Sequence, residues 1–128
     1  MILEIKSDPA ELKIVRRNIE NFCKENVSKI DSFLVKLAVD EALQNIIRYA
    51  YDFDKTKKII ITLEKISENS LKAELRDFGT RVSSSEIKPR ELHDVRPGGL
   101  GIHFIKNIAK KMSYEHKDDG GTLLTLVF

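Results

Sequence analysis

Two polar residues in an otherwise apolar stretch, Glu41 and Asn45, are spaced so that they could act on the same substrate. Residues 40–51, DEALQNIIRYAY, have the pattern of a helix, in which side chains four positions apart share one face. A carboxamide oxygen can ligate a hard cation such as Mg²⁺, and a nearby carboxylate can take a proton. The spacing therefore suits metal-assisted proton transfer, and it also suits two solvated residues beside a core.

A second candidate is the triplet Asp77-Phe78-Gly79, which follows a strand-like segment. Aspartate and glycine are common turn formers, so the triplet alone indicates a turn. Beside a purine pocket, the carboxylate of Asp77 could accept a hydrogen bond from an exocyclic amine, and Gly79 would allow close backbone approach. The His-Arg-Asp loop that accompanies such a triplet in eukaryotic-type protein kinases is absent from this sequence.

A third candidate is the run Gly98-Gly99-Leu100-Gly101, which precedes an apolar-periodic segment. Backbone N–H groups at the start of a helix can bind phosphate, although the same glycines could simply be a hinge. The run is not a Walker A loop because no Lys-Ser or Lys-Thr follows it. It is not a Rossmann fingerprint either, because no strand leads directly into it.

Composition excludes several classes of protein. The 128 residues are 41% hydrophobic, which fits one domain with its own core, and 22 basic against 20 acidic residues give a net charge of only +2. Scattered basic residues provide no footprint for direct nucleic-acid binding. One cysteine and three histidines leave no disulfide and no zinc-type spacing, and no apolar run is long enough for a membrane span. We expect a single soluble domain over residues 1–128 in the cytoplasm.

Hydrophobic periodicity predicts the elements that must position these candidates. Asp8, Pro9 and Glu11 have the order of an N-cap, a first-turn proline and a capping-box acid, and Asp31 or Ser32 can cap the next helix. The expected elements are a strand at 2–5, helices to about 24 and about 51, strands at 59–65 and 71–76, a helix from 100, and strands at 112–116 and 122–128. Residues 81–99 lack periodicity, which favours a functional lid.

In chain order, Glu41-x-x-x-Asn45, Asp77-x-Gly79, Gly99-x-Gly101 and Gly121-Thr122 resemble the N, G1 and G2 boxes and the final threonine of the histidine-kinase-like (GHKL) ATPases. The resemblance spans almost the whole chain and is greatest to the anti-sigma-factor serine/threonine kinases of the RsbW and SpoIIAB type. It implies a Bergerat ATP-binding fold, an α/β (α+β) two-layer sandwich with a mixed, mostly antiparallel sheet and helices on one face. Tyr49, where relatives often have histidine, and Thr80-Arg81, in place of a further glycine, depart from the pattern.

The resemblance also implies ATP and Mg²⁺ as cofactors and a role for each motif. Glu41 would be the general base and Asn45 the magnesium ligand, while Asp77 and Gly79 would form the adenine pocket with support from Thr122. The phosphates would be held by the lid and the residues after it, namely Arg96, Gly98, Gly99, Leu100 and Gly101.

The function that the resemblance implies is an anti-sigma factor that phosphorylates a STAS-type anti-anti-sigma partner and sequesters a sigma factor. The resemblance also favours a homodimer.

 

Three other readings are compatible with parts of the pattern. An ATP-gated protein-binding module without phosphotransfer activity would need no general base, so Glu41 argues against it. A catalytic fragment of a sensor histidine kinase would be expected to follow a helix with a phospho-accepting histidine. A gyrase-like or mismatch-repair-like ATPase would need a further domain that supplies a lysine to the terminal phosphate.

Overall fold

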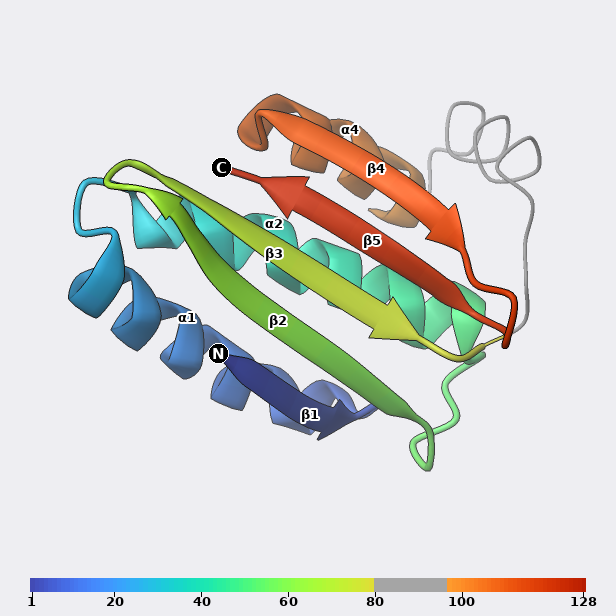
Figure 1. The fold of residues 1–128 in the computed structure, drawn as a ribbon. Helices are drawn as coiled ribbons and strands as arrows, with labels where there is room; N and C mark the ends of the chain where they lie inside the picture. Colours follow the sequence, from blue (N-terminus) through green and yellow to red (C-terminus); the bar gives the residue numbers. More distant parts are fainter. Residues whose placement is uncertain (80–96) are drawn as a thin grey trace.

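The computed structural model describes residues 1–79 and 97–128, with the helix path but not the side chains for residues 97–102. These residues form a five-stranded sheet in the order β1-β2-β3-β5-β4 (Figure 1). The strands are β1 (Ile2–Lys6), β2 (Lys58–Ser67), β3 (Ser70–Asp77), β4 (Lys111–His116) and β5 (Thr122–Val127). All four strand pairs are antiparallel, so the described sheet has no parallel pair, whereas a mixed sheet was expected.

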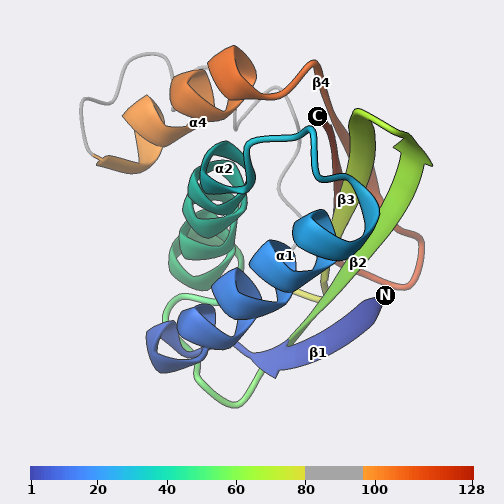
Figure 2. The ribbon, with the colours of Figure 1, turned by 90° about the vertical axis from the view of Figure 1, so that its left-hand side faces the viewer.

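Helices cover one face of this sheet, as the perpendicular view shows (Figure 2). They are α1 (Leu12–Asn26), α2 (Ser32–Asn45) and α4 (Pro97–Ile108), with a short 3₁₀ turn at Pro9–Glu11 and a π-helical turn at Ile46–Ala50. The helix α2 lies between α1 and α4 and packs against both. The expected two-layer α/β sandwich with helices on one face is confirmed.

Local capping explains where the 3₁₀ turn that leads into α1 and the helix α2 begin. The carboxylate of Asp8 accepts a hydrogen bond from the backbone N–H of Ala10 at 3.0 Å, and Asp31 caps α2 through the N–H of Phe33 at 3.0 Å. The expected capping box is not formed. The carboxylate of Glu11 instead accepts from the N–H of Lys6 at 3.0 Å, which ties the helix start to the end of β1.

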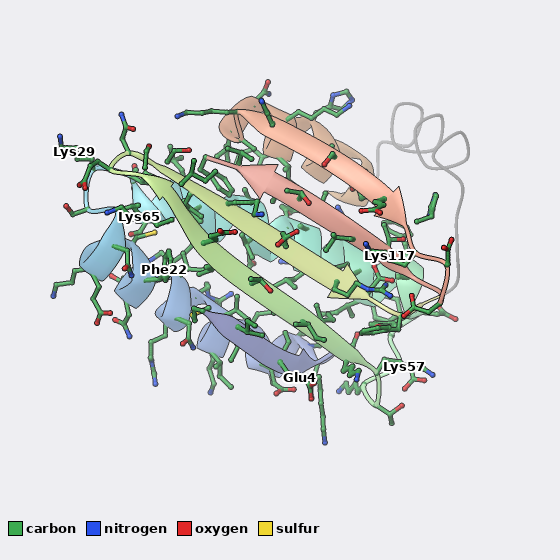
Figure 3. All side chains as sticks on the ribbon, in the orientation of Figure 1. Glu4, Phe22, Lys29, Lys57, Lys65 and Lys117 are labelled. Atoms are coloured by element: carbon green, nitrogen blue, oxygen red, sulfur yellow. The ribbon has the colours of Figure 1, made fainter. Side chains whose placement is uncertain are left out.

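The core lies between the helices and the sheet because alternate strand residues face inward. In β3 the buried positions are Leu71, Ala73, Leu75 and Asp77, so one carboxylate continues an otherwise apolar row. Mostly polar residues occupy the other face, which is toward the viewer in Figure 3, although Ile60, Leu123 and Val127 also lie on it. There Lys72 pairs with Glu64 and Glu74. Among the described helices, none covers that outer face.

The second helix changes its geometry directly after Asn45. An α-helix to about residue 51 was expected, but the α-helix ends at Asn45 and a π-helical turn continues to Ala50. The backbone N–H of Tyr51 donates to the carbonyl of Ile46 at 3.1 Å, and the left-handed residues Asp52 and Phe53 then end the helix. Such π-turns are rare and occur frequently at functional sites.

Candidate functional site

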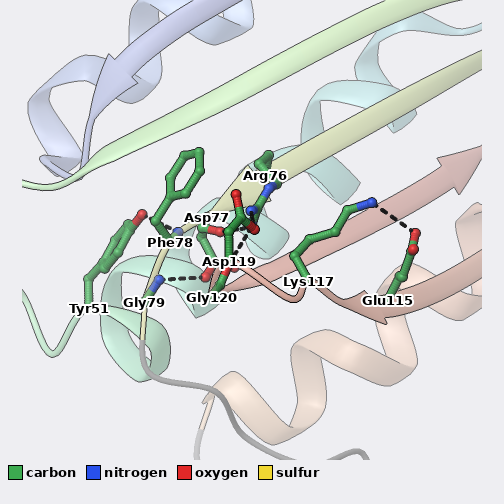
Figure 4. Close-up of polar contacts among 9 residues, drawn as sticks. All are labelled: Tyr51, Arg76, Asp77, Phe78, Gly79, Glu115, Lys117, Asp119 and Gly120. Carbon is green, nitrogen blue, oxygen red and sulfur yellow. Dashed lines mark hydrogen bonds and ion pairs between the residues drawn. The ribbon is translucent and has the colours of Figure 1, made fainter.

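The side chain of Asp77 is buried at the end of β3, with only 4% of the residue exposed. Its Oδ1 accepts a hydrogen bond from the backbone N–H of Gly79 at 3.0 Å, which closes a tight turn (Figure 4). Burial raises the pKa of the Asp77 carboxyl, and the N–H of Gly79 and the charge of Arg76 oppose that rise. A carboxylate accepts up to about four hydrogen bonds, so the Gly79 contact leaves acceptor capacity for a ligand amine.

Two glycines bring the backbone of three segments together at this turn. A Cβ on Gly79 would lie 2.3 Å from the carbonyl oxygen of Ala50, at the end of the π-helical turn. A Cβ on Gly121 would lie 2.0 Å from the carbonyl oxygen of Asp77, and Gly121 has a left-handed φ of 78°. The end of the second helix, the Asp77 turn and the start of β5 therefore meet at distances that only glycine permits.

Tyr51 links the turn at Asp77-Phe78-Gly79 to the end of the second helix. Its buried hydroxyl accepts a hydrogen bond from the N–H of Phe78 at 2.6 Å and donates one to the carbonyl of Lys58 at 2.5 Å (Figure 4 shows the first contact). Burial raises the pKa of the Tyr51 phenol, so the hydroxyl keeps the proton that it donates. Sequence reasoning missed this role, because a tyrosine at a helix end gives no sign of its partners.

Arg76 joins the same turn to the connection between β4 and β5. Its guanidinium donates to the carbonyl of Asp77, to the carbonyl of Gly120 at 2.9 Å and to the carboxylate of Asp119 at 2.7 Å. It also lies over the ring of Phe78, 4.2 Å from the ring centre. These contacts, drawn in Figure 4, hold the residues just before Thr122 against the end of β3. Sequence reasoning missed these contacts because Arg76 is far along the chain from Asp119 and Gly120.

Glu41 and Asn45 lie one turn apart on α2, as the spacing predicts. The amide Nδ2 and Oδ1 of Asn45 are both buried, and neither has a hydrogen-bond partner among the described residues. Buried polar atoms are nearly always paired, so an unpaired carboxamide is the kind of group that a bound ligand or ion satisfies. The donor chemistry fits Mg²⁺, which takes oxygen ligands.

The carboxyl of Glu41 is partly buried, and this burial raises its pKa. The charge of Arg48 acts to lower that pKa, and the charge of Asp40 acts to raise it. Asp40 is itself held by Arg16 of α1, with 2.7 Å between Nη1 and Oδ1, and by the amide of Gln44 at 2.9 Å. A carboxyl with a raised pKa is better matched to accepting a proton near neutral pH than a free one.

The structure differs from the sequence expectation at the glycine run. The lid was expected to end at Gly99 and the helix to begin at Leu100, but α4 already begins at Pro97, so Gly98 and Gly99 belong to the start of the helix together with Leu100 and Gly101. The helix α4 packs beside α2, so it lies in the same helix layer as Glu41 and Asn45. Arg96 and most of the expected lid, residues 81–96, lie outside the described residues.

Thr122 lies directly opposite Asp77 in the β3–β5 register, so the two side chains share the helix-facing side of the sheet. The predicted adenine-end residues Asp77, Gly79 and Thr122 are thus brought together. In the described part of the chain, no three acidic, cysteine or histidine side chains are grouped so as to hold a metal ion. Within the same ranges, no helix has both the length and the apolar character needed to cross a bilayer.

Solved structures of sensor kinases share the fold. The mycobacterial sensor histidine kinase MprB superposes with a TM-score of 0.60 over 100% of this chain and 97% of that chain, at 14% sequence identity. The catalytic domain of histidine kinase ThkA gives a TM-score of 0.61 over 100% of this chain and 95% of that one, at 16% identity. At such identities the likeness shows the fold alone, and that fold is the α/β Bergerat type.

Two characterised relatives are serine or threonine kinases by name. The serine/threonine-protein kinase BtrW of Bordetella bronchiseptica is 30% identical over 98 residues, which are 73% of this chain and 68% of BtrW. The serine-protein kinase RsbW of Staphylococcus aureus is 28% identical over 96 residues, which are 69% of this chain and 60% of RsbW. The match therefore spans less than two thirds of the length of RsbW.

A family model agrees with both comparisons. The model described as "Histidine kinase-like ATPase domain" matches residues 5–128, which is nearly the whole chain. The match includes every residue of the candidate site, from Glu41 on α2 to Thr122 on β5. The chain therefore belongs to the histidine kinase-like ATPase family, and its named relatives include the RsbW-type serine kinases.

Proposed function

We propose that this protein is an ATP-dependent serine/threonine protein kinase that acts as an anti-sigma factor. Its substrate is a small STAS-domain anti-anti-sigma protein, and its other partner is a sigma factor that it sequesters when it does not engage the STAS protein. The working form is a homodimer in the cytoplasm. Support comes from the kinase relatives BtrW and RsbW and from the arrangement of Glu41 and Asn45.

The unpaired buried carboxamide of Asn45 is the observation that carries the proposal. Its oxygen would hold Mg²⁺, and the metal would neutralise charge on the phosphates of ATP. Glu41, one turn earlier on α2, would take the proton from the serine or threonine hydroxyl as that oxygen attacks the terminal phosphorus, while the bond from this phosphorus to ADP breaks and ADP leaves. Its raised pKa suits this step, because the carboxylate must hold the proton once it has accepted it.

Asp77 and its neighbours would select the nucleotide base. The buried carboxylate accepts from an exocyclic amine, and the turn closed by Gly79 keeps that carboxylate in one orientation. A Cβ on Gly79 would clash with the backbone of Ala50 and a Cβ on Gly121 with that of Asp77, so neither position can carry a side chain in this arrangement. Binding the base here and the metal at Asn45 would orient the terminal phosphate toward Glu41, and positioning of this kind contributes much of the rate in phosphoryl transfer.

The decisive experiment compares phosphotransfer by the parent protein, Glu41→Gln and Glu25→Gln. Each is incubated with magnesium, ATP and the STAS proteins of the same source, and phosphoserine and phosphothreonine are followed by mass spectrometry. Glu25 is an exposed carboxylate on α1, so its variant controls for the loss of one charge. We expect Glu41→Gln to slow transfer by about 10² to 10⁴ and to retain a complex with the unphosphorylated partner.

Two results would contradict the proposal in different ways. If Glu41→Gln transfers phosphate at the parental rate, Glu41 is not the base. If the parent binds ATP and a STAS protein but never phosphorylates it, the protein is an ATP-gated binding module instead. Gel filtration of the same mixtures separates the second case from a simple failure to bind.

A further inference from the structure

Three polar side chains lie in one row across the ends of three neighbouring strands. Asp77 on β3 is paired with Thr122 on β5, and Thr122 is paired with His116 on β4. Residues directly opposite one another in a sheet place their side chains on the same face. Since Asp77 is buried toward the helix layer, Thr122 and His116 face that layer as well.

His116 differs from an ordinary edge-strand histidine in its hydrogen bonding. Its ring nitrogens Nδ1 and Nε2 are both shielded from solvent, and neither has a hydrogen-bond partner among the described residues. It is close enough to Asp77 for the two groups to interact electrostatically. A shielded imidazole of this kind has lost its hydrogen bonds to water and gained no others. That loss is unfavourable unless a ligand supplies the missing hydrogen-bond partners.

The three side chains of the row offer the hydrogen-bond donors and acceptors that match a nucleobase edge. A neutral imidazole offers one donor and one acceptor, a threonine hydroxyl offers both, and the carboxylate of Asp77 is an acceptor. A purine edge likewise alternates amine donors with ring-nitrogen acceptors. Neighbouring positions in such a row are about 5 Å apart, so three strands span the width of one base.

We propose that His116 is a further base-contacting residue, which hydrogen-bonds a ring nitrogen or exocyclic group of the adenine beside those bound by Asp77 and Thr122. This inference rests on the proposed nucleotide site. It adds a residue on β4 to a pocket otherwise built from β3, β5 and the second helix. His116 then has a role in choosing the base and none in phosphotransfer.

Nitrogen NMR of the histidine rings tests the contact directly. The 128-residue protein with magnesium is titrated with ADP, adenosine and pyrophosphate, and the His116 ring signals are assigned with His116→Gln. We expect these signals to move with ADP and adenosine and to stay unchanged with pyrophosphate. The exposed ring of His103 on α4 is the internal control.

Affinity measurements provide the second readout. By calorimetry, His116→Phe should bind ADP about tenfold more weakly, the loss typical of one hydrogen bond, with no fall in the melting temperature of the free protein. His116→Gln, which keeps a donor and an acceptor, should stay within about threefold of the parent, as should His103→Phe. If a variant fails to fold, the NMR titration of the parent protein still tests the contact between His116 and the base.

The outcomes separate this inference from the proposed function. If the parent binds magnesium-ADP but the His116 signals do not move, or if His116→Phe binds ADP as tightly as the parent, the inference is wrong and the nucleotide site stands. An equal response to pyrophosphate places His116 at the phosphates and also overturns the inference. If the parent binds no nucleotide at all, the proposed function fails and this inference fails with it.

Discussion

Gly121 packs so closely against Asp77 that a Cβ on the glycine would lie 2.0 Å from the aspartate's carbonyl oxygen. The two residues belong to segments that are distant in the sequence. Asp77 is itself a residue of the candidate site, and Gly121 directly precedes another, Thr122. The adjacent Gly120 has a left-handed φ of 102°, yet a Cβ there would meet no atom within 4 Å. The two glycines therefore serve different purposes.

The first prediction uses this pair as a matched comparison. Gly120→Ala should lose about 1 to 2 kcal/mol of unfolding free energy, the cost of a left-handed alanine. Gly121→Ala should lose more, because the same backbone cost is joined by a clash with the backbone of Asp77, and it should also weaken ADP binding. Urea unfolding and calorimetry of both variants measure these changes. Equal losses would show that the close approach is not important.

The fold could largely be predicted from periodicity, because most elements bury one regular face. The stripe of α1 through Leu12, Val15 and Ile19 is buried as expected, and the strands alternate as expected. The end of the second helix could not be predicted in this way. A π-helical turn keeps nearly the same apolar pattern as an α-helix, so residues 46–50 carry no separate signal.

The candidate site was predictable only where its chemistry is local. Glu41 and Asn45 share a helix face, and Asp77 and Gly79 form one turn, so spacing alone indicates both pairs. The contacts of Tyr51 and the row that ends in His116 arise from strand order and register, which the sequence does not display. Tyr51 and His116, which no sequence motif indicated, were therefore found only from contacts between segments that are distant in the sequence.

The second prediction concerns Tyr51→Phe, which removes one hydroxyl and keeps the ring. The N–H of Phe78 would lose its acceptor and the carbonyl of Lys58 would lose a donor. We expect a loss of about 1 to 3 kcal/mol of unfolding free energy and weaker ADP binding, because the Asp77 turn is less firmly held. Thermal unfolding and calorimetry test this. A fully stable variant with parental affinity would contradict the role given to the hydroxyl.

The third prediction follows from the raised pKa of Asp77. Its folded pKa lies above the unfolded value of about 3.9, so the folded state prefers the protonated form. The associated stability is present in full below the unfolded pKa and is lost as pH rises through the folded pKa. Asp77→Asn has no such titration, so its stability relative to the parent should increase with pH across this window and then stay constant.

Chemical denaturation of both proteins between about pH 3 and 8 measures this difference, since a pKa change of one corresponds to about 1.4 kcal/mol. The same variant should bind ADP roughly 10 to 100 times more weakly, because the charged acceptor for the amine is gone. A relative stability that falls with pH would show that the folded pKa is lowered instead. If Asp77→Asn binds ADP as tightly as the parent, Asp77 does not contact the nucleotide base.

The fourth prediction concerns Arg16, which neutralises Asp40 beside the proposed base. In Arg16→Gln the charge of Asp40 is no longer compensated, so it should raise the pKa of Glu41 further. A base must be ionised to act, so the acidic limb of the pH–rate profile should move to higher pH. Stability should change by no more than about 1 kcal/mol, because the pair is partly exposed. Lys13→Gln, an exposed charge loss on the same helix, should leave the profile unchanged.

The last prediction separates binding from stability at Asn45. Asn45→Leu replaces an unpaired buried carboxamide by an apolar group of similar size, so the free protein should be as stable as the parent or more stable by up to about 1 kcal/mol. The magnesium-dependent part of ATP affinity should be lost, because the cation loses an oxygen ligand. A residue that costs stability and serves only the ligand is expected at a functional site.

The neighbouring Gln44 provides the matched control for this change. Its amide donates to Asp40 at 2.9 Å, so Gln44→Leu should lose about 1 kcal/mol of unfolding free energy and keep its magnesium dependence. Melting temperatures with and without magnesium-ATP, together with calorimetry, measure both effects. If Asn45→Leu destabilises the free protein as Gln44→Leu does, and still binds ATP with the parental response to magnesium, then the carboxamide of Asn45 is a structural group and the metal is held elsewhere.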